Sequence, residues 1–200
     1  VVTIFGGILG YLYQIQVARL LNLSDFAIFS ALMGLGVFIG SPLATLLMLV
    51  ARRVAILKAN DNYIELRLMF WRLNKIVLFT GILLFLIFIF WVNSLQHYLK
   101  VTSFFPILLF YVYILFAGLH QIGLGFLQGG QFYVWFSTLF LLGFLLKILL
   151  SWIFIDIGLG LNGAMLAISM TIIIIWAIGF WAALNKFSKE KKYSTCLSHK

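Results

Sequence analysis

Residues 132–155 read FYVWFSTLFLLGFLLKILLSWIFI and contain a single charged side chain, Lys147. A helix of these 24 residues would be about 36 Å long, slightly more than the roughly 30 Å hydrocarbon layer of a bilayer. Backbone N–H and C=O groups in lipid need partners within the protein, and a helix supplies them without a neighbouring strand. The stretch therefore predicts a transmembrane helix.

Five further apolar runs have the same character. They cover residues 1–18, 26–50, 76–93, 104–127 and 161–184. Of the 200 residues, 64% are hydrophobic and 10% are charged, which leaves too little polar surface for a soluble domain. We predict an all-α membrane protein with six transmembrane helices.

Positive charge is distributed unevenly between the two sides of these spans. The chain has 14 Lys and Arg residues against 5 Asp and Glu, and a net charge of +9. Eleven of the 14 lie in the connector 51–75 and the polar tail 185–200, which six spans would place on one side. They are Arg52, Arg53, Lys58, Arg67, Arg72, Lys75, Lys186, Lys189, Lys191, Lys192 and Lys200.

Cytoplasmic loops are the basic ones in membrane proteins. We therefore predict that both termini, the connector 51–75 and the turn 128–131 are cytoplasmic, in a cytoplasmic (inner) membrane. An excess of basic over acidic residues can also indicate nucleic-acid binding. Cations beside membrane spans point instead to membrane lipids with anionic headgroups, so we expect no nucleic-acid partner.

The longest connector carries its own helix signal. Asn60-Asp61-Asn62 predicts a turn followed by a helix amino-terminal cap. From Tyr63 the sequence is half polar at helical spacing, which predicts an interfacial helix over 63–75 that runs into the span 76–93. A second cap, before the span 26–50, is predicted from Asn22, Ser24 and Asp25.

Small residues and one proline suggest how the helices pack. Gly158-x-Gly160-x-x-Gly163 matches a dinucleotide-binding fingerprint in its letters but follows no predicted strand, so a tight turn is the better interpretation. Three glycine pairs at a spacing of four, Gly6/Gly10, Gly36/Gly40 and Gly125/Gly129, predict close helix approaches. Pro42 lies mid-span and is a kink or hinge candidate.

Lys147 is the candidate functional residue that the sequence singles out. It lies nine residues from Asp156, or about 13 Å below the helix end, so its charge does not easily reach an interface. Either a water-filled cavity or an anionic substrate would offset that cost. Gln14, Gln16 and Gln128 are weaker candidates, each also consistent with a bond between helices. Arg19 is either an interfacial anchor or a substrate contact.

The sequence offers little support for an enzyme. No carboxylate pair and no metal-spaced set of His, Asp and Glu occurs, and the acids lie at membrane edges or in connectors. We expect no catalytic residue, no metal and no cofactor.

Several motifs, taken in order, resemble a known family. Residues 16–29, QVARLLNLSDFAIF, resemble the passage between the first two helices of the polysaccharide and oligosaccharide flippases. Residues 49–55, LVARRVA, resemble the basic exit from the second helix, and FLQGGQF at 126–132 with GLGLNGA at 158–164 resembles the region of helices four to six. These flippases belong to the multidrug/oligosaccharidyl-lipid/polysaccharide exporter superfamily. One departure is Ala27, where glycine is usual.

The resemblance implies a particular architecture and mechanism. Such transporters have two six-helix lobes around a central cavity, and this chain resembles the amino-terminal lobe. The second lobe would be either a missing part of the chain or another copy. We expect a longer chain because this one begins Val1-Val2 rather than with Met.

The implied substrate is a glycan linked to a polyprenyl diphosphate, moved across the membrane by alternating access. Cations and amides would line its path, with Lys147, Arg19, Arg52 and the three glutamines as candidates. The alternatives are a drug or metabolite exporter of the same superfamily and a non-transporting membrane scaffold.

Overall fold

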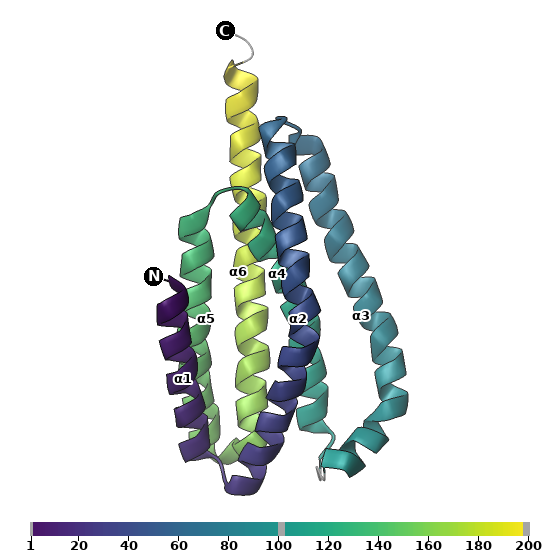
Figure 1. Ribbon diagram of the computed structural model, residues 1–200, viewed down its shortest axis with the longest axis vertical. Helices are drawn as coiled ribbons and strands as arrows, with labels where there is room; N and C mark the ends of the chain where they lie inside the picture. Colours follow the sequence, from purple (N-terminus) through teal and green to yellow (C-terminus); the bar gives the residue numbers. More distant parts are fainter. Residues whose placement is uncertain (1, 100–102, 198–200) are drawn as a thin grey trace.

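The chain folds as a bundle of helices in a computed structural model (Figure 1). The backbone is described for residues 2–99 and 103–197, and the side chains for 4–90, 96 and 103–185. Within these ranges the α-helices are α1 (Val2–Leu20), α2 (Leu23–Ala59), α3 (Tyr63–Leu99), α4 (Phe105–Gly129), α5 (Tyr133–Phe154) and α6 (Gly160–Leu197). The all-α prediction is confirmed.

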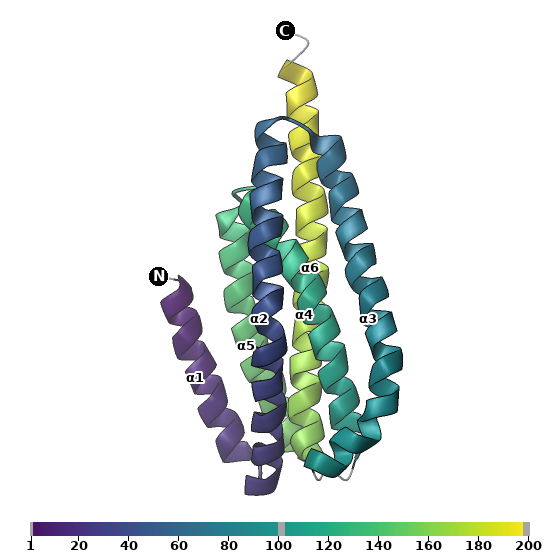
Figure 2. The ribbon, with the colours of Figure 1, turned by 45° about the vertical axis from the view of Figure 1, so that its right-hand side comes forward.

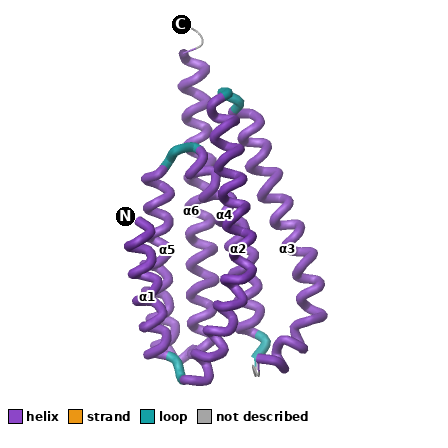
Figure 3. Tube along the Cα trace, in the orientation of Figure 1, coloured by secondary structure: helices purple, strands orange, loops and turns teal. Residues whose placement is uncertain are grey.

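The helices run alternately up and down, and the described loops lie at the two ends of the bundle (Figure 3). The turns at 60–62 and 130–132 lie at the same end as the carboxy terminus (Figure 1). A direct contact joins these two turns, because the Lys58 ammonium donates to the Gly130 carbonyl over 2.8 Å. The connector 51–75 and the turn 128–131 therefore lie at the same end of the bundle, as we expect from the predicted order of the six spans.

Helix α4 lies at the centre of the packing. It contacts α2 on one side and α6 on another, while α5 packs on α6 and α1 packs mainly on α5. Hydrogen bonds reinforce the contacts of α4 with α6 and with α3. The Ser169 hydroxyl of α6 donates to the Leu109 carbonyl of α4 over 2.8 Å, and the Tyr111 hydroxyl of α4 donates to the Gly81 carbonyl of α3. The core consequently follows α4 along its length.

Among the residues whose side chains are described, four helical stretches are long and apolar enough to cross a membrane: 23–59, 63–90, 105–129 and 133–185. The last contains both α5 and α6, which run in opposite directions (Figure 1). On α3, large apolar side chains such as Phe79, Ile82 and Phe90 are exposed. Such a surface is costly in water and favourable in hydrocarbon. The protein is thus suited to span a membrane.

Helix α3 is longer than the sequence suggested. The predicted interfacial segment 63–75 and the span 76–93 form one continuous helix without a break. Its predicted amino-terminal cap is confirmed: the Glu65 N–H donates to Asn62 Oδ1 over 3.2 Å, and Asn62 Nδ2 donates to Glu65 Oε2 over 2.8 Å. The first bond is an amino-terminal cap bond, and the second holds the two side chains together. The cap predicted for α2 is wrong in detail, because Asn22 occupies the cap position but makes no side-chain cap bond.

The reversal between α5 and α6 depends on glycine. Gly158 has φ of 91° and Gly160 has φ of 50°, backbone conformations that residues with a Cβ adopt only with strain. The chain reverses over Ile155–Leu159, where Gly158 leaves the helical conformation and separates α5 from α6. The interpretation of this glycine pattern as a tight turn is confirmed.

Two of the three glycine pairs lie at close helix contacts. A Cβ on Gly125 would meet Val50 of α2 at 2.9 Å, and one on Gly129 would meet Val54 at 2.8 Å and the Ala51 carbonyl at a shorter distance. Gly6 and Gly10 of α1 lie against Phe140 and Phe144 of α5 in the same way. The third pair is only half right: Gly36 approaches Phe110, whereas no described atom lies within 4 Å of a Cβ on Gly40.

Pro42 lies inside α2, which continues on both sides of it. The proline supplies no N–H, so the Phe38 carbonyl one turn earlier loses its helical donor. The role of Pro42 as a hinge remains a prediction.

The contact between α2 and α4 gives a stability prediction. Gly129→Ala should destabilise the protein by about 1–3 kcal/mol, because the new methyl group overlaps Val54 and the Ala51 carbonyl. The matched control is Gly34→Ala on α2, where the new methyl group meets no described atom within 4 Å. Thermal unfolding in detergent should show a lower Tm for Gly129→Ala only. Equal Tm values for the two variants would contradict the close approach.

Candidate functional site in the helix bundle

Lys147 lies on α5 with its side chain partly buried. Its Nζ atom lies 4.1 Å from the centre of the Tyr13 ring on α1. A cation over an aromatic face is attracted by the negative face of the ring, worth about 0.5–2 kcal/mol. A charge in the membrane interior costs more than this. The ring therefore only partly offsets the cost of placing Lys147 here.

Hydroxyl groups from α4 and from α5 itself lie near Tyr13 and this cation. Ser151, one helical turn beyond Lys147, is fully buried and interacts with the Tyr13 hydroxyl. Tyr113 of α4 lies near Tyr13 as well. The Tyr13 ring makes an edge contact with Phe29 of α2 at 6.3 Å between ring centres. The site therefore brings together side chains from α1, α4 and α5, with α2 forming an apolar wall.

The hydroxyl oxygens of Tyr13 and Ser151 are buried and lie beside each other, and neither has a further hydrogen-bond partner among the described residues. One hydrogen bond between them leaves one O–H without an acceptor, and a buried unpaired donor costs about 1–3 kcal/mol. Both can donate to an acceptor, and both lie beside a cation that donates only. The group that would satisfy all three is an anion with several acceptor oxygens.

Gln16 fixes α1 beside this site. Its Nε2 atom donates over 3.0 Å to the carbonyl of Ile148, the residue that follows Lys147. Gln16 thus acts as a bond between helices, one of the two roles that the sequence left open for it. The bond sets the register of α1 on α5 and so keeps the Tyr13 ring over the ammonium group.

No ion pair neutralises Lys147 within the described part of the chain. Asp25 lies beside Gly160, where a Cβ on that glycine would meet its carboxylate at 3.3 Å, so this acid belongs to the turn at the end of the bundle. The described residues also contain no group of three or more His, Cys, Asp or Glu that could hold a metal ion. The cluster can bind an anion by charge and by hydroxyl donors.

A groove of about 630 Å³ lies between α1 and α5, next to the cluster. Gln16 and Arg19 contribute its polar groups, and its apolar wall consists of Leu12, Ile15, Leu20, Leu145, Ile148, Leu149 and Trp152. Arg19 is exposed, near the end of α1. An elongated apolar molecule with an anionic end would match this distribution of polar and apolar surface.

The other candidate residues lie elsewhere. Gln14 is exposed on α1, outside the groove and the cluster. Arg52 is exposed toward the carboxy-terminal end of α2, and Gln128 is partly buried at the end of α4. The structure therefore brings together Lys147 and Gln16, with Arg19 on the adjoining groove, and does not add Gln14, Arg52 or Gln128 to them.

Tyr13, Tyr113 and Ser151 were not identified from the sequence. One signal was available for two of them: Ser151 follows Lys147 by four residues, and Tyr13 precedes Gln16 by three, so each pair shares a helix face. Which face of α1 meets which face of α5 is a tertiary contact, and no spacing within either helix predicts it.

Comparison with protein-family profiles, curated proteins and solved structures gave no match for this chain.

The cost of the buried charge gives a second prediction. Lys147→Met should raise the apparent Tm by roughly 3 °C or more, because an apolar side chain of similar length removes a charge without an acidic partner. Lys75→Met, at an exposed position on α3, is the matched control and should leave Tm unchanged. Thermal unfolding in detergent measures both. A Tm several degrees lower for Lys147→Met would show that the lysine stabilises the fold and would contradict this account.

Proposed function

We propose that this chain is one lobe of a flippase that moves lipid-linked oligosaccharide or polysaccharide precursors across the cytoplasmic membrane. The observation that carries the proposal is the Lys147 cluster, a cation beside two buried hydroxyl groups inside an apolar bundle. The resemblance of three sequence stretches to the oligosaccharide flippases supports the same substrate class. We assign the chain no catalytic activity.

The physical problem of such a flippase is the headgroup of its substrate. A diphosphate and a hydrated sugar lose their water in hydrocarbon, and the protein must replace those interactions. A lysine gives the charge, and phenol and serine hydroxyls give charge-assisted hydrogen bonds to phosphate oxygens. The apolar groove between α1 and α5 would hold the polyprenyl chain beside the headgroup, with Arg19 as a further cation.

Six membrane crossings, one for each of α1 to α6, fit the alternating directions of the helices (Figure 1). The described cations of the connector 51–75 lie toward the end that carries the turn at 60–62. In the orientation that we propose, this end faces the cytoplasm, as basic connectors do. The lysines of the tail have side chains outside the described residues.

Helix α2 offers a surface for the second lobe. One stripe of its exposed residues, at spacings of three and four, is rich in small and hydroxyl-bearing side chains: Ala27, Ala31, Gly34, Phe38, Ser41, Thr45, Met48 and Arg52. Exposed residues on α3 are instead large and apolar, as lipid contacts are. Small residues let helices of two lobes approach closely. Helix α1 diverges from α2 above their shared turn (Figure 2).

This arrangement would give alternating access. Two lobes that rock against each other along α2 would open the Lys147 cluster first to one side and then to the other. Pro42 lies on α2 near the middle of the stripe, where it could permit bending. Transport would require both lobes, whether the second is another segment or another copy.

A drug or metabolite exporter of the same superfamily is the nearest alternative. Ion-coupled exporters commonly place a carboxylate within the membrane. Here Asp25, Asp61, Glu65 and Asp156 all lie at helix ends or in turns. A non-transporting scaffold would have no use for Lys147, so loss of function on its replacement separates a scaffold from a transporter.

Binding of the proposed headgroup can be measured directly. Lys147→Gln should weaken binding of undecaprenyl diphosphate to the purified chain by on the order of tenfold, because one charged contact is lost. Lys75→Gln removes the same charge from an exposed site and should leave the dissociation constant unchanged. Equal affinities of the two variants for undecaprenyl diphosphate would show that the Lys147 cluster does not bind the substrate.

The need for a second lobe gives another prediction. Expression of this 200-residue chain alone in a flippase-deficient strain should not restore export of the lipid-linked glycan. Immunoblotting of the membrane fraction is the control that the chain is expressed and inserted into the membrane. Restored export by the chain, with no second lobe encoded in the strain, would overturn the two-lobe proposal.

A further inference from the structure

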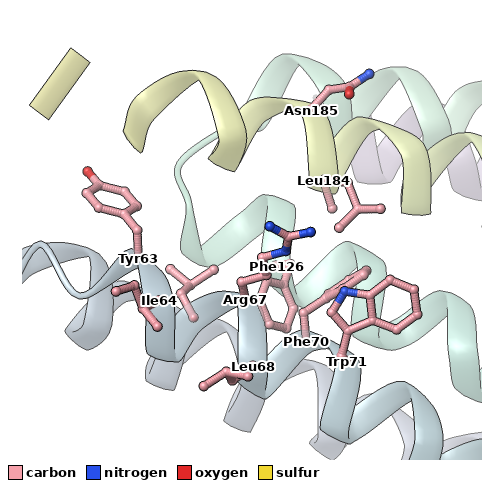
Figure 4. Close-up of a pocket in the computed structure, with 11 residues that line it drawn as sticks. Tyr63, Ile64, Arg67, Leu68, Phe70, Trp71, Phe126, Leu184 and Asn185 are labelled. Carbon is pink, nitrogen blue, oxygen red and sulfur yellow. The ribbon is translucent and has the colours of Figure 1, made fainter. Parts of the chain in front are cut away.

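A second groove lies at the other end of the bundle, between the first turns of α3 and the last described turns of α6 (Figure 4). Its volume is about 620 Å³. The residues that line it come from α3, α4 and α6, and they are Tyr63, Ile64, Leu66, Arg67, Leu68, Phe70, Trp71, Phe126, Ala183, Leu184 and Asn185. The Lys147 cluster contributes no residue to this groove.

Arg67 supplies the charge of the groove. Its guanidinium extends from α3 toward Leu184 of α6 (Figure 4). The nearest acidic residue along the chain, Glu65, pairs with Arg53 at 3.6 Å and caps α3 through Asn62. Arg67 forms no ion pair with the residues that the structure describes. The groove therefore presents an unneutralised guanidinium, which suits an anion with two oxygens in one plane.

Apart from Arg67, Tyr63 and Asn185, the residues that line the groove are apolar. The Phe70 ring makes an edge contact with Phe126 at 4.7 Å and a tilted contact with Phe180 at 5.1 Å between ring centres. Trp71 meets the same Phe180 ring at 5.7 Å. Rings held by one another form a fixed wall. A small hydrated anion gains nothing from such a wall, whereas a hydrocarbon chain does.

The groove lies at the depth where lipid headgroups meet acyl chains. Along the described part of α3, the charged residues end at Lys75. Exposed apolar residues alternate with charged ones before that point, and from Ile76 to Phe90 the exposed side chains are uncharged and mostly apolar. Arg67 and Trp71 therefore precede the uncharged part of the helix by about two and a half turns and about one and a half turns, respectively. Tryptophan favours this boundary in membrane proteins.

We propose that this groove binds an anionic phospholipid. The phosphate would pair with the Arg67 guanidinium, and an acyl chain would lie against Leu68, Phe70 and Trp71. A basic pocket between helices near the cytoplasmic face is the kind of site that holds such headgroups. A bound lipid would fasten α3 to α6 at their ends. The site is independent of the flippase proposal, because it shares no residue with the substrate path.

Native mass spectrometry of the purified 200-residue chain in detergent tests this proposal. The probes are phosphatidylglycerol and phosphatidylcholine with identical acyl chains. We expect the first phosphatidylglycerol to bind on the order of fivefold more tightly, as one nearby arginine would provide. Arg67→Gln should abolish the difference. Arg72→Gln is the matched control, since it removes an exposed arginine of α3 outside the groove, and it should keep the difference.

Two further arms separate the possible outcomes. Arg67→Lys should keep most of the preference, which shows that any loss in Arg67→Gln comes from charge rather than misfolding. Inorganic phosphate at the same concentration as the lipid should not displace it. Any of three results would overturn the proposal. They are equal affinity of the chain for the two lipids, equal loss of the lipid preference in Arg67→Gln and Arg72→Gln, and displacement of the lipid by inorganic phosphate. None of these results bears on undecaprenyl diphosphate binding at Lys147.

Discussion

One ammonium group has to be held inside a bundle whose outer surface suits hydrocarbon. The neighbourhood of Lys147 is organised around this constraint. The Tyr13 ring covers the ammonium, Gln16 fastens α1 to α5 one residue away, and two buried hydroxyls lie close by with no further partner among the described residues. A bundle selected for stability alone would place an apolar residue at this position. The cost of this buried charge is the reason for our proposal that a ligand brings negative charge to the cluster.

The packing of the helices allows this cluster to exist at the edge of the core. Helix α4 provides the stable centre, where Gly125 and Gly129 bring it close to α2. Helix α1 is attached mainly to α5 and diverges from α2 (Figure 2). A helix with few neighbours can move at a modest free-energy cost. The polar residues thus lie between the firmly packed part of the bundle and the helix that is least enclosed.

The sequence predicted local features well because they depend on neighbouring residues. The described part of each apolar run lies within a helix apart from at most one residue at each end, the Asn62–Glu65 cap forms, and Gly158 and Gly160 make the reversal. Site residues were harder to predict. Lys147 could be identified because a charged residue within an apolar run is evident from the sequence alone. Tyr13 and Ser151 resemble ordinary membrane-helix residues until α1 is placed on α5. Arg52 and Gln128 were grouped with Lys147 by chemistry alone, and they lie elsewhere in the bundle.

The central claim is that an anionic lipid headgroup binds where α1 meets α5. Photo-crosslinking with a diazirine-bearing polyprenyl diphosphate, followed by peptide mapping, tests it most directly. The account predicts that labelled peptides come from α1 around Tyr13 and from α5 around Lys147, and that excess unlabelled undecaprenyl diphosphate removes the label. Label spread over the exposed apolar face of α3, or label that the unlabelled lipid does not displace, would contradict it.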